Sequence, residues 1–274
     1  MAHPRAKMRR MFELVEPIAA VSFGDAVLGA FLEHGMRTIW DGYFAGRAAA
    51  LGRVPAEVVH AAFYSFAEGE AARHIPWVWS KVTPDEAIRI RERSSAAALR
   101  HRFGALADPP GLDRTIALAT RAAFSAPTEG RVLYAALRSL DLPADPVARL
   151  WHVTTLLREY RGDGHSIALA ANGIAGTEAH VLFAISLGMR PAEFGRLHHL
   201  PAARLDAVLG GLRQRGLIDG NSFTAAGRAL HGRIEALTDD LAAPAYEVLS
   251  PGELDELIAG LEPLTASFPA DTST

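Results

Sequence analysis

The eight residues REYRGDGH, from Arg158 to His165, gather four charged side chains and a histidine around two glycines inside an otherwise apolar segment. Two chemical uses of this segment are open. Arg158 and Arg161 could hold the carboxylate or phosphate of a small ligand, because guanidinium groups bind such anions through paired hydrogen bonds. Alternatively, Asp163 could orient His165 as a general base, with Glu159 beside them, in an enzyme site.

A purely structural interpretation of the same segment competes with both uses. A helix that starts at Asp145 would end near Arg161, with Gly162 as its left-handed cap. Gly164 would allow a second sharp turn before a new helix starts at Ser166. In that arrangement the arginines favour the helix dipole and the aspartate caps the following helix, so only the glutamate and the histidine lack a role.

Aromatic side chains supply a second candidate wall for a ligand pocket. Trp40, Tyr43 and Trp77 belong to aromatic-rich segments. Such residues commonly form a hydrophobic core, but around a cavity they would suit a flat apolar ligand whose anionic group meets Arg158 and Arg161. No cofactor is indicated by the sequence.

A metal site is not expected. The chain has no cysteine, so a metal would need histidine and carboxylate ligands. His152, Glu178 and His180 are the nearest candidates to join His165, and their spacing matches no zinc or iron motif.

The composition narrows the class of protein. With 274 residues and 49% hydrophobic side chains, the chain can form one large domain or two to three small ones. The net charge of −3 gives no global electrostatic argument for nucleic-acid binding. No run of 18 apolar residues occurs, and acidic residues and a proline interrupt the apolar part of the N-terminus, so we expect a soluble cytoplasmic protein with no membrane partner.

Helix signals dominate the chain and predict an all-α fold. Thr83 to Glu86 and Ser250 to Glu253 both read as capping boxes with proline at the first helical position. Asp145 followed by proline starts a third helix with apolar side chains at helical spacing. The segment ADPPGLD at 107 to 113 breaks the helical pattern and is the best internal hinge.

These signals divide the chain into a multi-helix N-terminal part and a C-terminal domain. Two stretches in the first part share a tryptophan followed seven positions later by an arginine, Trp40 with Arg47 and Trp151 with Arg158, which leaves duplication and chance both open. The expected ranges are a helical module over 1–106, a second over 107–188, a winged helix over 189–264 and a flexible tail over 265–274.

The C-terminal part has the pattern of a helix-turn-helix. A short helix at 192–197 and a tight turn precede a longer helix at 202–215, which ends in RGLI. The stretches AEFGRL, VLGGLRQRGLI, FTAAGRAL and LSPGELDELIAGLEPL resemble, in this order, the winged helix of MarR-type regulators over residues 189–264. The resemblance implies DNA binding by a winged helix, and regulators of this kind act as homodimers that respond to small molecules.

Two departures from that family are visible. The start of the longer helix offers only Arg204 as a contact to bases or phosphates. Only DGNS stands where the family has a long basic hairpin, so the wing is very short. Between Arg190 and Arg233, however, seven arginines face three acidic residues, and Arg204, Arg213 and Arg215 are the candidate DNA contacts.

The whole chain also resembles a family of uncharacterised actinobacterial proteins described as containing a helix-turn-helix. Three hypotheses follow from these observations. The first is a ligand-responsive winged-helix transcriptional regulator, working as a homodimer. The second is an enzyme with an acid–base site around Asp163 and His165, in which the winged helix is a scaffold. The third is a non-catalytic protein that binds a partner.

Overall fold

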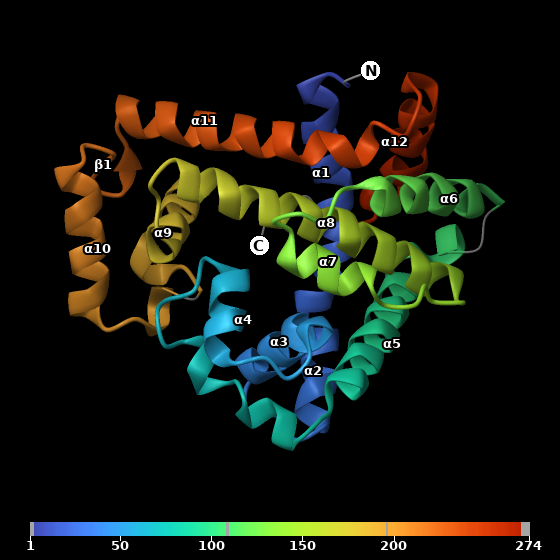
Figure 1. Ribbon diagram of the computed structural model, residues 1–274, viewed down its shortest axis with the longest axis horizontal. Helices are drawn as coiled ribbons and strands as arrows, with labels where there is room; N and C mark the ends of the chain where they lie inside the picture. Colours follow the sequence, from blue (N-terminus) through green and yellow to red (C-terminus); the bar gives the residue numbers. More distant parts are fainter. Residues whose placement is uncertain (1–2, 108–109, 196, 270–274) are drawn as a thin grey trace.

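The computed structural model describes residues 3–107, 110–195 and 197–269, and confirms the all-α fold (Figure 1). The described residues form twelve α-helices and one two-stranded hairpin. The elements are α1 (Arg5–Ala20), α2 (Asp25–Glu33), α3 (Ile39–Ala48), α4 (Ala56–Phe63), α5 (Pro84–Phe103), α6 (Pro110–Ser125), α7 (Val132–Arg138), α8 (Pro146–Ala171), α9 (Gly176–Ser186), α10 (Ala202–Gln214), β1 (Ile218–Asp219), β2 (Ser222–Phe223), α11 (Ala225–Ala242) and α12 (Pro251–Thr265).

Helix α8 is the central element, with α1, α5, α6, α7 and α11 packed around it. Its start is fixed by Asp145, whose carboxylate accepts a hydrogen bond from the Ala148 N–H at 2.8 Å, and by Pro146 at the first helical position. Apolar side chains of α8 are buried on every face, as expected for a helix inside a bundle. They include Val147, Leu150, Trp151, Val153, Leu156, Leu157 and Tyr160.

Three hydrophobic clusters hold the molecule together, and they group the elements differently from the ranges expected from the sequence. One joins α1, α6, α8 and α12, together with the later turns of α5. A second joins α2, α3, α4 and the first turns of α5. The third joins the end of α8 to α9, α10, β1 and α11. Helix α12, expected within the winged helix, therefore packs in the body of the protein against α1 and α6.

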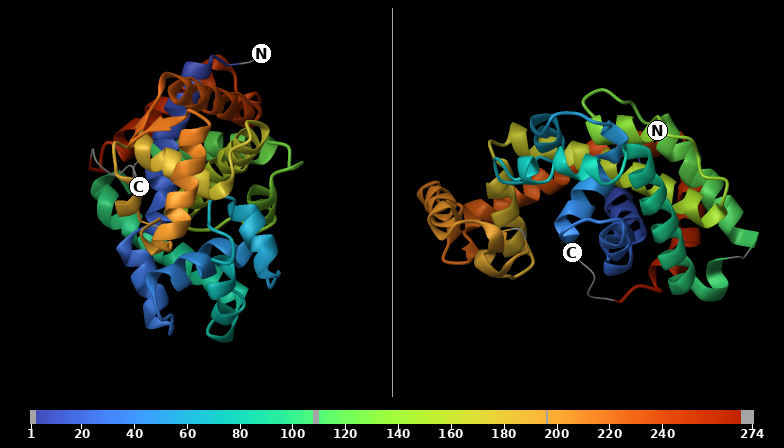
Figure 2. Two further views of the ribbon diagram at one scale, coloured as in Figure 1. Left: turned by 90° about the vertical axis from the view of Figure 1, so that its left-hand side faces the viewer. Right: turned by 90° about the horizontal axis from the view of Figure 1, so that it is seen from below.

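The helix-turn-helix unit stands at one end of the molecule (Figures 1 and 2). The predicted short helix at 192–197 is replaced by two 3-10 turns, Pro191–Glu193 and Leu197–His199. The longer helix forms as predicted, as α10.

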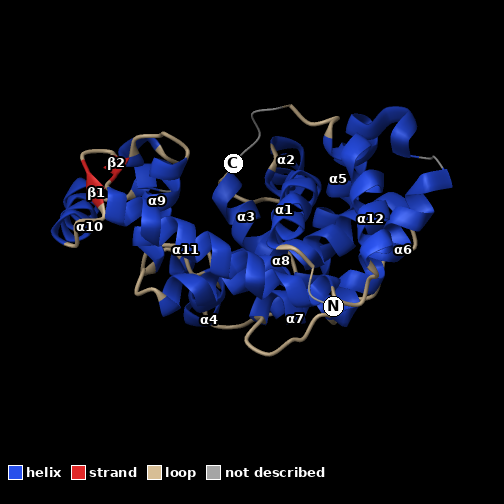
Figure 3. Ribbon diagram, turned by 90° about the horizontal axis from the view of Figure 1, so that it is seen from above, coloured by secondary structure: helices blue, strands red, loops and turns tan. Residues whose placement is uncertain are grey.

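The predicted very short wing is present as the hairpin β1–β2, the two strands drawn in red in Figure 3. In this hairpin Ile218 pairs with Phe223 and Asp219 with Ser222. Gly220 takes a φ of 55° at the turn, a conformation that favours glycine.

Helix α11 connects this unit to the body. It starts at the hairpin, where the Thr224 hydroxyl accepts from the Gly227 N–H at 3.0 Å, and then runs alongside α8 (Figure 1). A short turn then leads into α12, which is capped by Ser250 and Glu253 as predicted, and the capping box at Thr83 and Glu86 also forms.

Two expectations fall partly outside the described residues. Within the predicted hinge at 107–113, residues 108 and 109 are not described, and α6 starts directly after them. Within the predicted tail, residues 270–274 are not described.

The N-terminal stretch Arg5–Glu33 is long and apolar enough to cross a membrane by length and composition alone. In the structure it is divided into α1 and α2, and Met11, Leu14 and Ile18 of α1 are buried in the core. The apolar character of this stretch is thus used to cover α8 and α12.

Candidate functional site

The segment REYRGDGH lies in the middle of α8 and does not interrupt it. The predicted helix end near Arg161, the left-handed Gly162 and the restart at Ser166 are therefore wrong. Gly164 is needed for a different reason: a Cβ there would collide with the guanidinium of Arg131. That guanidinium lies across α8 and donates hydrogen bonds to the carbonyls of Tyr160 and Leu241, at 2.8 and 2.9 Å.

Arg158 and Glu159 belong to a buried cluster of charges. Arg47 Nη2 lies 3.1 Å from Glu159 Oε2, and Arg158 Nη1 lies 2.7 Å from Glu159 Oε1. Arg158 Nε also reaches Glu16, at 3.0 Å. Burial by itself would raise the pKa of Glu159, but the attraction of Arg47 and Arg158 outweighs it and lowers that pKa to about 2.

Arg161 faces α11 instead of this cluster. Its Nη2 lies 3.2 Å from both Glu235 Oε2 and Asp239 Oδ1, and its guanidinium lies 3.9 Å from the centroid of the Phe12 ring. Arg9 of α1 contacts the same two carboxylates, at 2.8 and 2.9 Å. The arginine expected to hold a ligand thus joins α1, α8 and α11 to one another.

The proposed acid–base pair of Asp163 and His165 is not assembled. Asp163 Oδ2 accepts a hydrogen bond from the backbone N–H of Tyr134 at 3.0 Å, at the start of α7. His165 Nδ1 lies 3.0 Å from Thr238 Oγ1 and 3.8 Å from Glu235 Oε1. Residues two apart on a helix point in different directions, so an unbroken α8 separates these side chains.

Burial shifts the titration of both side chains toward their neutral forms. It raises the pKa of Asp163 to about 7, against the hydrogen bond from Tyr134. It lowers the pKa of His165 to about 4, although a third of that side chain stays exposed. His165 therefore lies beside Thr238 and Glu235 in its neutral form, and the predicted pair with Asp163 is absent.

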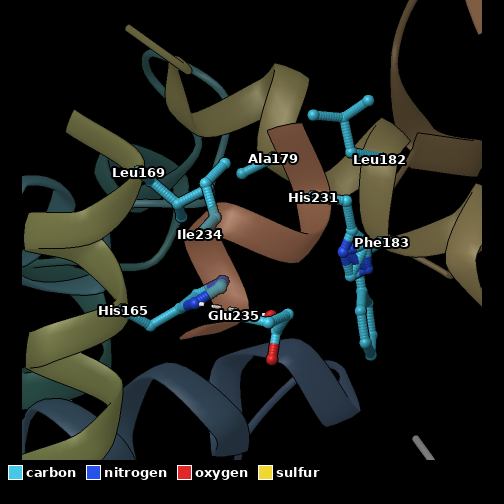
Figure 4. Close-up of a pocket in the computed structure, with 8 residues that line it drawn as sticks. All are labelled: His165, Leu169, Ala179, Leu182, Phe183, His231, Ile234 and Glu235. Carbon is cyan, nitrogen blue, oxygen red and sulfur yellow. Dashed lines mark ion pairs between the residues drawn. The ribbon is translucent and has the colours of Figure 1, made fainter. Parts of the chain in front are cut away.

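His165 lines a pocket of about 330 Å³, partly open to solvent, between α8, α9 and α11 (Figure 4). Glu235 and His231 contribute the other polar side chains of this pocket, and Glu235 is already paired with Arg9 and Arg161. The remaining wall is apolar and consists of Leu169, Ala179, Leu182, Phe183 and Ile234.

Two of the three aromatic candidates, Trp40 and Tyr43, lie together, and Trp77 packs against the same hydrophobic cluster. Tyr43 is buried, and its hydroxyl accepts a hydrogen bond from Arg47 at 3.1 Å, so it borders the charged cluster around Glu159. Trp40 lies beside Tyr43, with ring centroids 5.6 Å apart. Trp77 lies under the guanidinium of Arg37, 3.6 Å from the ring centroid, away from Arg158.

Arg91 and His152 are buried polar residues that sequence reasoning did not select. Arg91 is the third arginine near Glu159, and burial lowers its pKa to about 10. Burial likewise lowers the pKa of His152 to about 4, assisted by the charge of Arg91. In the sequence, Arg91 is one of several arginines in IRIRER on a charged helix, and nothing there marks it as buried.

The candidate DNA contacts are exposed on α10 and just after it. Arg204 donates to the backbone carbonyl of Glu68 at 3.3 Å, and Arg215 pairs with Glu178 at 3.1 Å. Arg213 is exposed, and its side chain makes no hydrogen bond or ion pair with the described part of the chain. Of the three, Arg213 is the arginine most readily available to an external anion.

Among the described residues, no group of three or more histidine, aspartate or glutamate side chains could hold a metal ion.

The fold and this end unit together define an all-helical protein that carries a helix-turn-helix with a very short hairpin. The chain belongs to the Helix-turn-helix family, whose model matches residues 8–273. No curated protein and no solved structure matches the chain. The family match thus covers the helical body as well as the helix-turn-helix unit.

Proposed function

We propose that this protein is a DNA-binding transcriptional regulator of the MarR-like kind, acting as a homodimer and responding to a small molecule. The observation that carries the proposal is the placement of α10. This helix stands at one end of the molecule, next to the short hairpin (Figure 1), and its arginines, Arg204 and Arg213, are exposed. A helix presented in this way can enter the major groove, which admits an α-helix.

The charge of the end unit supports contact with phosphates. Between residues 190 and 233 seven arginines face three acidic residues, a local excess of four positive charges in a chain whose net charge is −3. Arg213 and Arg228 are both exposed and form no ion pair with the described part of the chain. Arg204 and Arg215 are held by exposed or partly exposed acidic partners, and such surface pairs are weak enough to exchange for phosphate.

Direct reading of bases is limited by the small side chains of α10. Its exposed first turns present Ala202, Ala203 and Ala207 around Arg204. Alanine contacts a thymine methyl group but donates no hydrogen bond to a base edge. We therefore expect binding that is dominated by phosphates and by DNA shape, with strong salt dependence.

A homodimer would place two copies of α10 in successive major grooves, about 34 Å apart. The helical body is the part of the chain that would sense the ligand, since it holds the pockets and the buried charges. This role would also place the protein in the cytoplasm, with the chromosome.

The proposal is tested by fluorescence anisotropy with a labelled duplex from the region upstream of its own gene. Wild-type protein is expected to bind at low salt, and the double variant Arg213→Ala, Arg228→Ala to bind far more weakly. The matched control removes two exposed arginines of the body, as Arg53→Ala, Arg93→Ala, and should bind as wild type. Equal binding by the two double variants, or no binding by wild type at low salt, contradicts the proposal.

A further inference from the structure

A second pocket lies in the helical body, away from the helix-turn-helix unit. It is formed by α3, α5, α7 and α8 with the connections next to them, and its space of about 360 Å³ includes the solvent at its open mouth. Two buried polar side chains, Arg91 and His152, line it. Each is only 4% exposed.

Both side chains carry a buried nitrogen with no hydrogen-bond partner among the described residues, Nη2 of Arg91 and Nε2 of His152. Buried polar atoms in proteins are nearly always hydrogen-bonded, and a buried charge is usually paired. The Arg91 guanidinium makes one hydrogen bond, a long one of 3.4 Å to the Gly46 carbonyl, and contacts no carboxylate. Two such nitrogens on one pocket indicate that a bound group completes the site.

The balance of charge indicates the sign of that group. Three guanidinium groups meet two carboxylates in the buried cluster, namely Arg47, Arg91 and Arg158 with Glu16 and Glu159. Arg47 and Arg158 contact these carboxylates directly, so Arg91 is the arginine of this cluster that lacks a carboxylate in direct contact. The missing partner is therefore an anion.

The rest of the lining limits the kind of anion. Glu92 and Asp141 border the same pocket, and their negative charge disfavours a doubly charged phosphate. The remaining side chains are mostly apolar, and the ring of Trp151 lies 5.3 Å from the Arg91 guanidinium. Apart from Trp151, they are Ala50, Ile88, Leu137 and Leu140.

We infer that this pocket binds a small monocarboxylic acid with an aromatic or branched apolar body. Its carboxylate pairs with Arg91 and accepts a hydrogen bond from His152 in the tautomer that carries hydrogen on Nε2. Its apolar body lies against Trp151, Leu137 and Leu140. Binding at this site does not depend on DNA binding, whereas its use as the sensing site of a regulator rests on the proposed function.

The test is isothermal titration calorimetry of the full chain with benzoate, phenylacetate and 4-methylpentanoate. Benzamide and inorganic phosphate serve as the neutral and the doubly charged comparisons. At least one of the monocarboxylates is expected to bind at micromolar to millimolar concentration, and neither comparison compound is expected to bind. Absence of binding by all three acids, or equal binding of benzoate and benzamide, overturns the inference.

The variant Arg91→Met separates a ligand site from a structural role. It is expected to weaken binding of the carboxylate about tenfold to a hundredfold, because a charge-assisted hydrogen bond is lost. It should leave the thermal midpoint of the free protein unchanged or higher, since it replaces an unpaired buried charge by an apolar chain of similar length. Arg89→Met, an exposed site on the same helix, is the matched control and should bind as wild type.

A second variant keeps the inference testable if Arg91→Met does not fold. Leu140→Trp fills the pocket from its half-buried wall and leaves Arg91 in place. It is expected to abolish carboxylate binding, while DNA binding measured without ligand stays as in wild type. Unchanged carboxylate binding by Leu140→Trp would place the ligand elsewhere and overturn the assignment.

Discussion

Arg47 of α3 and Glu159 of α8, 112 residues apart in the sequence, meet through a buried ion pair of 3.1 Å. The pair connects two hydrophobic clusters, because α3 belongs to one and this part of α8 to the other. Arg158 contacts the other oxygen of the same carboxylate at 2.7 Å. Glu159 is thus the negative centre on which the buried arginines depend.

Glu159→Gln should destabilise the protein strongly. The change leaves Arg47, Arg91 and Arg158 with only Glu16 as a carboxylate partner, and breaking a buried pair from one side costs about 3–5 kcal/mol. Urea unfolding followed by circular dichroism measures the loss. Glu13→Gln, at an exposed pair with Arg10, is the control and should change the free energy of unfolding by less than about 1 kcal/mol.

Arg91→Met introduced into the Glu159→Gln protein should recover part of the lost stability. The charge count explains the expectation, since the second change removes a buried positive charge that Glu159 attracts in the wild type. A double-mutant cycle in urea measures the coupling. Purely additive effects of the two substitutions would show that Arg91 does not share the charge of Glu159.

Asp163→Asn should change how stability depends on pH. Burial raises the pKa of Asp163 to about 7 in the folded protein, against 3.8 for a free aspartate side chain, so between these values the folded chain holds a proton that the unfolded chain has released. The stability of the wild type therefore falls as pH rises from about 4 to about 7, while asparagine cannot titrate.

The difference in unfolding free energy between Asp163→Asn and wild type should thus increase with pH across that window. At about 1.4 kcal/mol per pKa unit, the increase is at most about 4 kcal/mol. Thermal or urea unfolding at several pH values measures it. A difference that stays constant from pH 4 to pH 7 would contradict the raised pKa.

The two glycines of REYRGDGH should respond to alanine in opposite directions. A Cβ at Gly162 would meet only Glu159 at an ordinary 3.7 Å, so Gly162→Ala should stabilise the helix by about 0.5–1 kcal/mol. Gly164→Ala would displace Arg131 from its two carbonyl acceptors and destabilise by about 1–3 kcal/mol. Urea unfolding of the two variants measures both changes in the free energy of unfolding, and each variant is the control for the other. Changes of the same sign would show that α8 bends or ends here.

Arg213→Ala should reduce the salt dependence of DNA binding. If Arg213 neutralises one phosphate, the slope of the logarithm of the affinity against the logarithm of salt concentration falls by about one. Anisotropy titrations at four or more salt concentrations measure the slope. An unchanged slope with weaker binding would indicate a structural effect of the substitution.

The starts of the helices were predictable, and the interior of α8 was not. Caps such as Thr83 and Asp145 act within four residues, so the sequence next to them is sufficient. Whether a glycine ends a helix depends on what packs against it, and for Gly164 that partner is Arg131, 33 positions earlier. A local interpretation of two glycines therefore predicted a break that tertiary packing removes.

The sequence identified the charged residues of the candidate site but not the carboxylates with which they form ion pairs. Arg158 and Arg161 stand out by their density in the sequence, whereas Glu16 and Asp239, which pair with them, are 142 and 78 residues away. Because the sequence does not show these ion pairs, it predicted that the two arginines are available to a ligand. Arg91, which lacks a carboxylate partner, stands in a charged stretch typical of a solvated helix.

Helix α11 connects the hairpin to the helical body as one continuous helix. Its 18 residues span about 27 Å. The ion pairs of Arg9 and Arg161 with Glu235 and Asp239 hold it against α1 and α8. A tilt of roughly 10° about these ion pairs would move the start of the helix, about 12 residues or 18 Å away, by about 3 Å. Small rearrangements around α8 would thus be magnified at the hairpin, without any flexible joint between them.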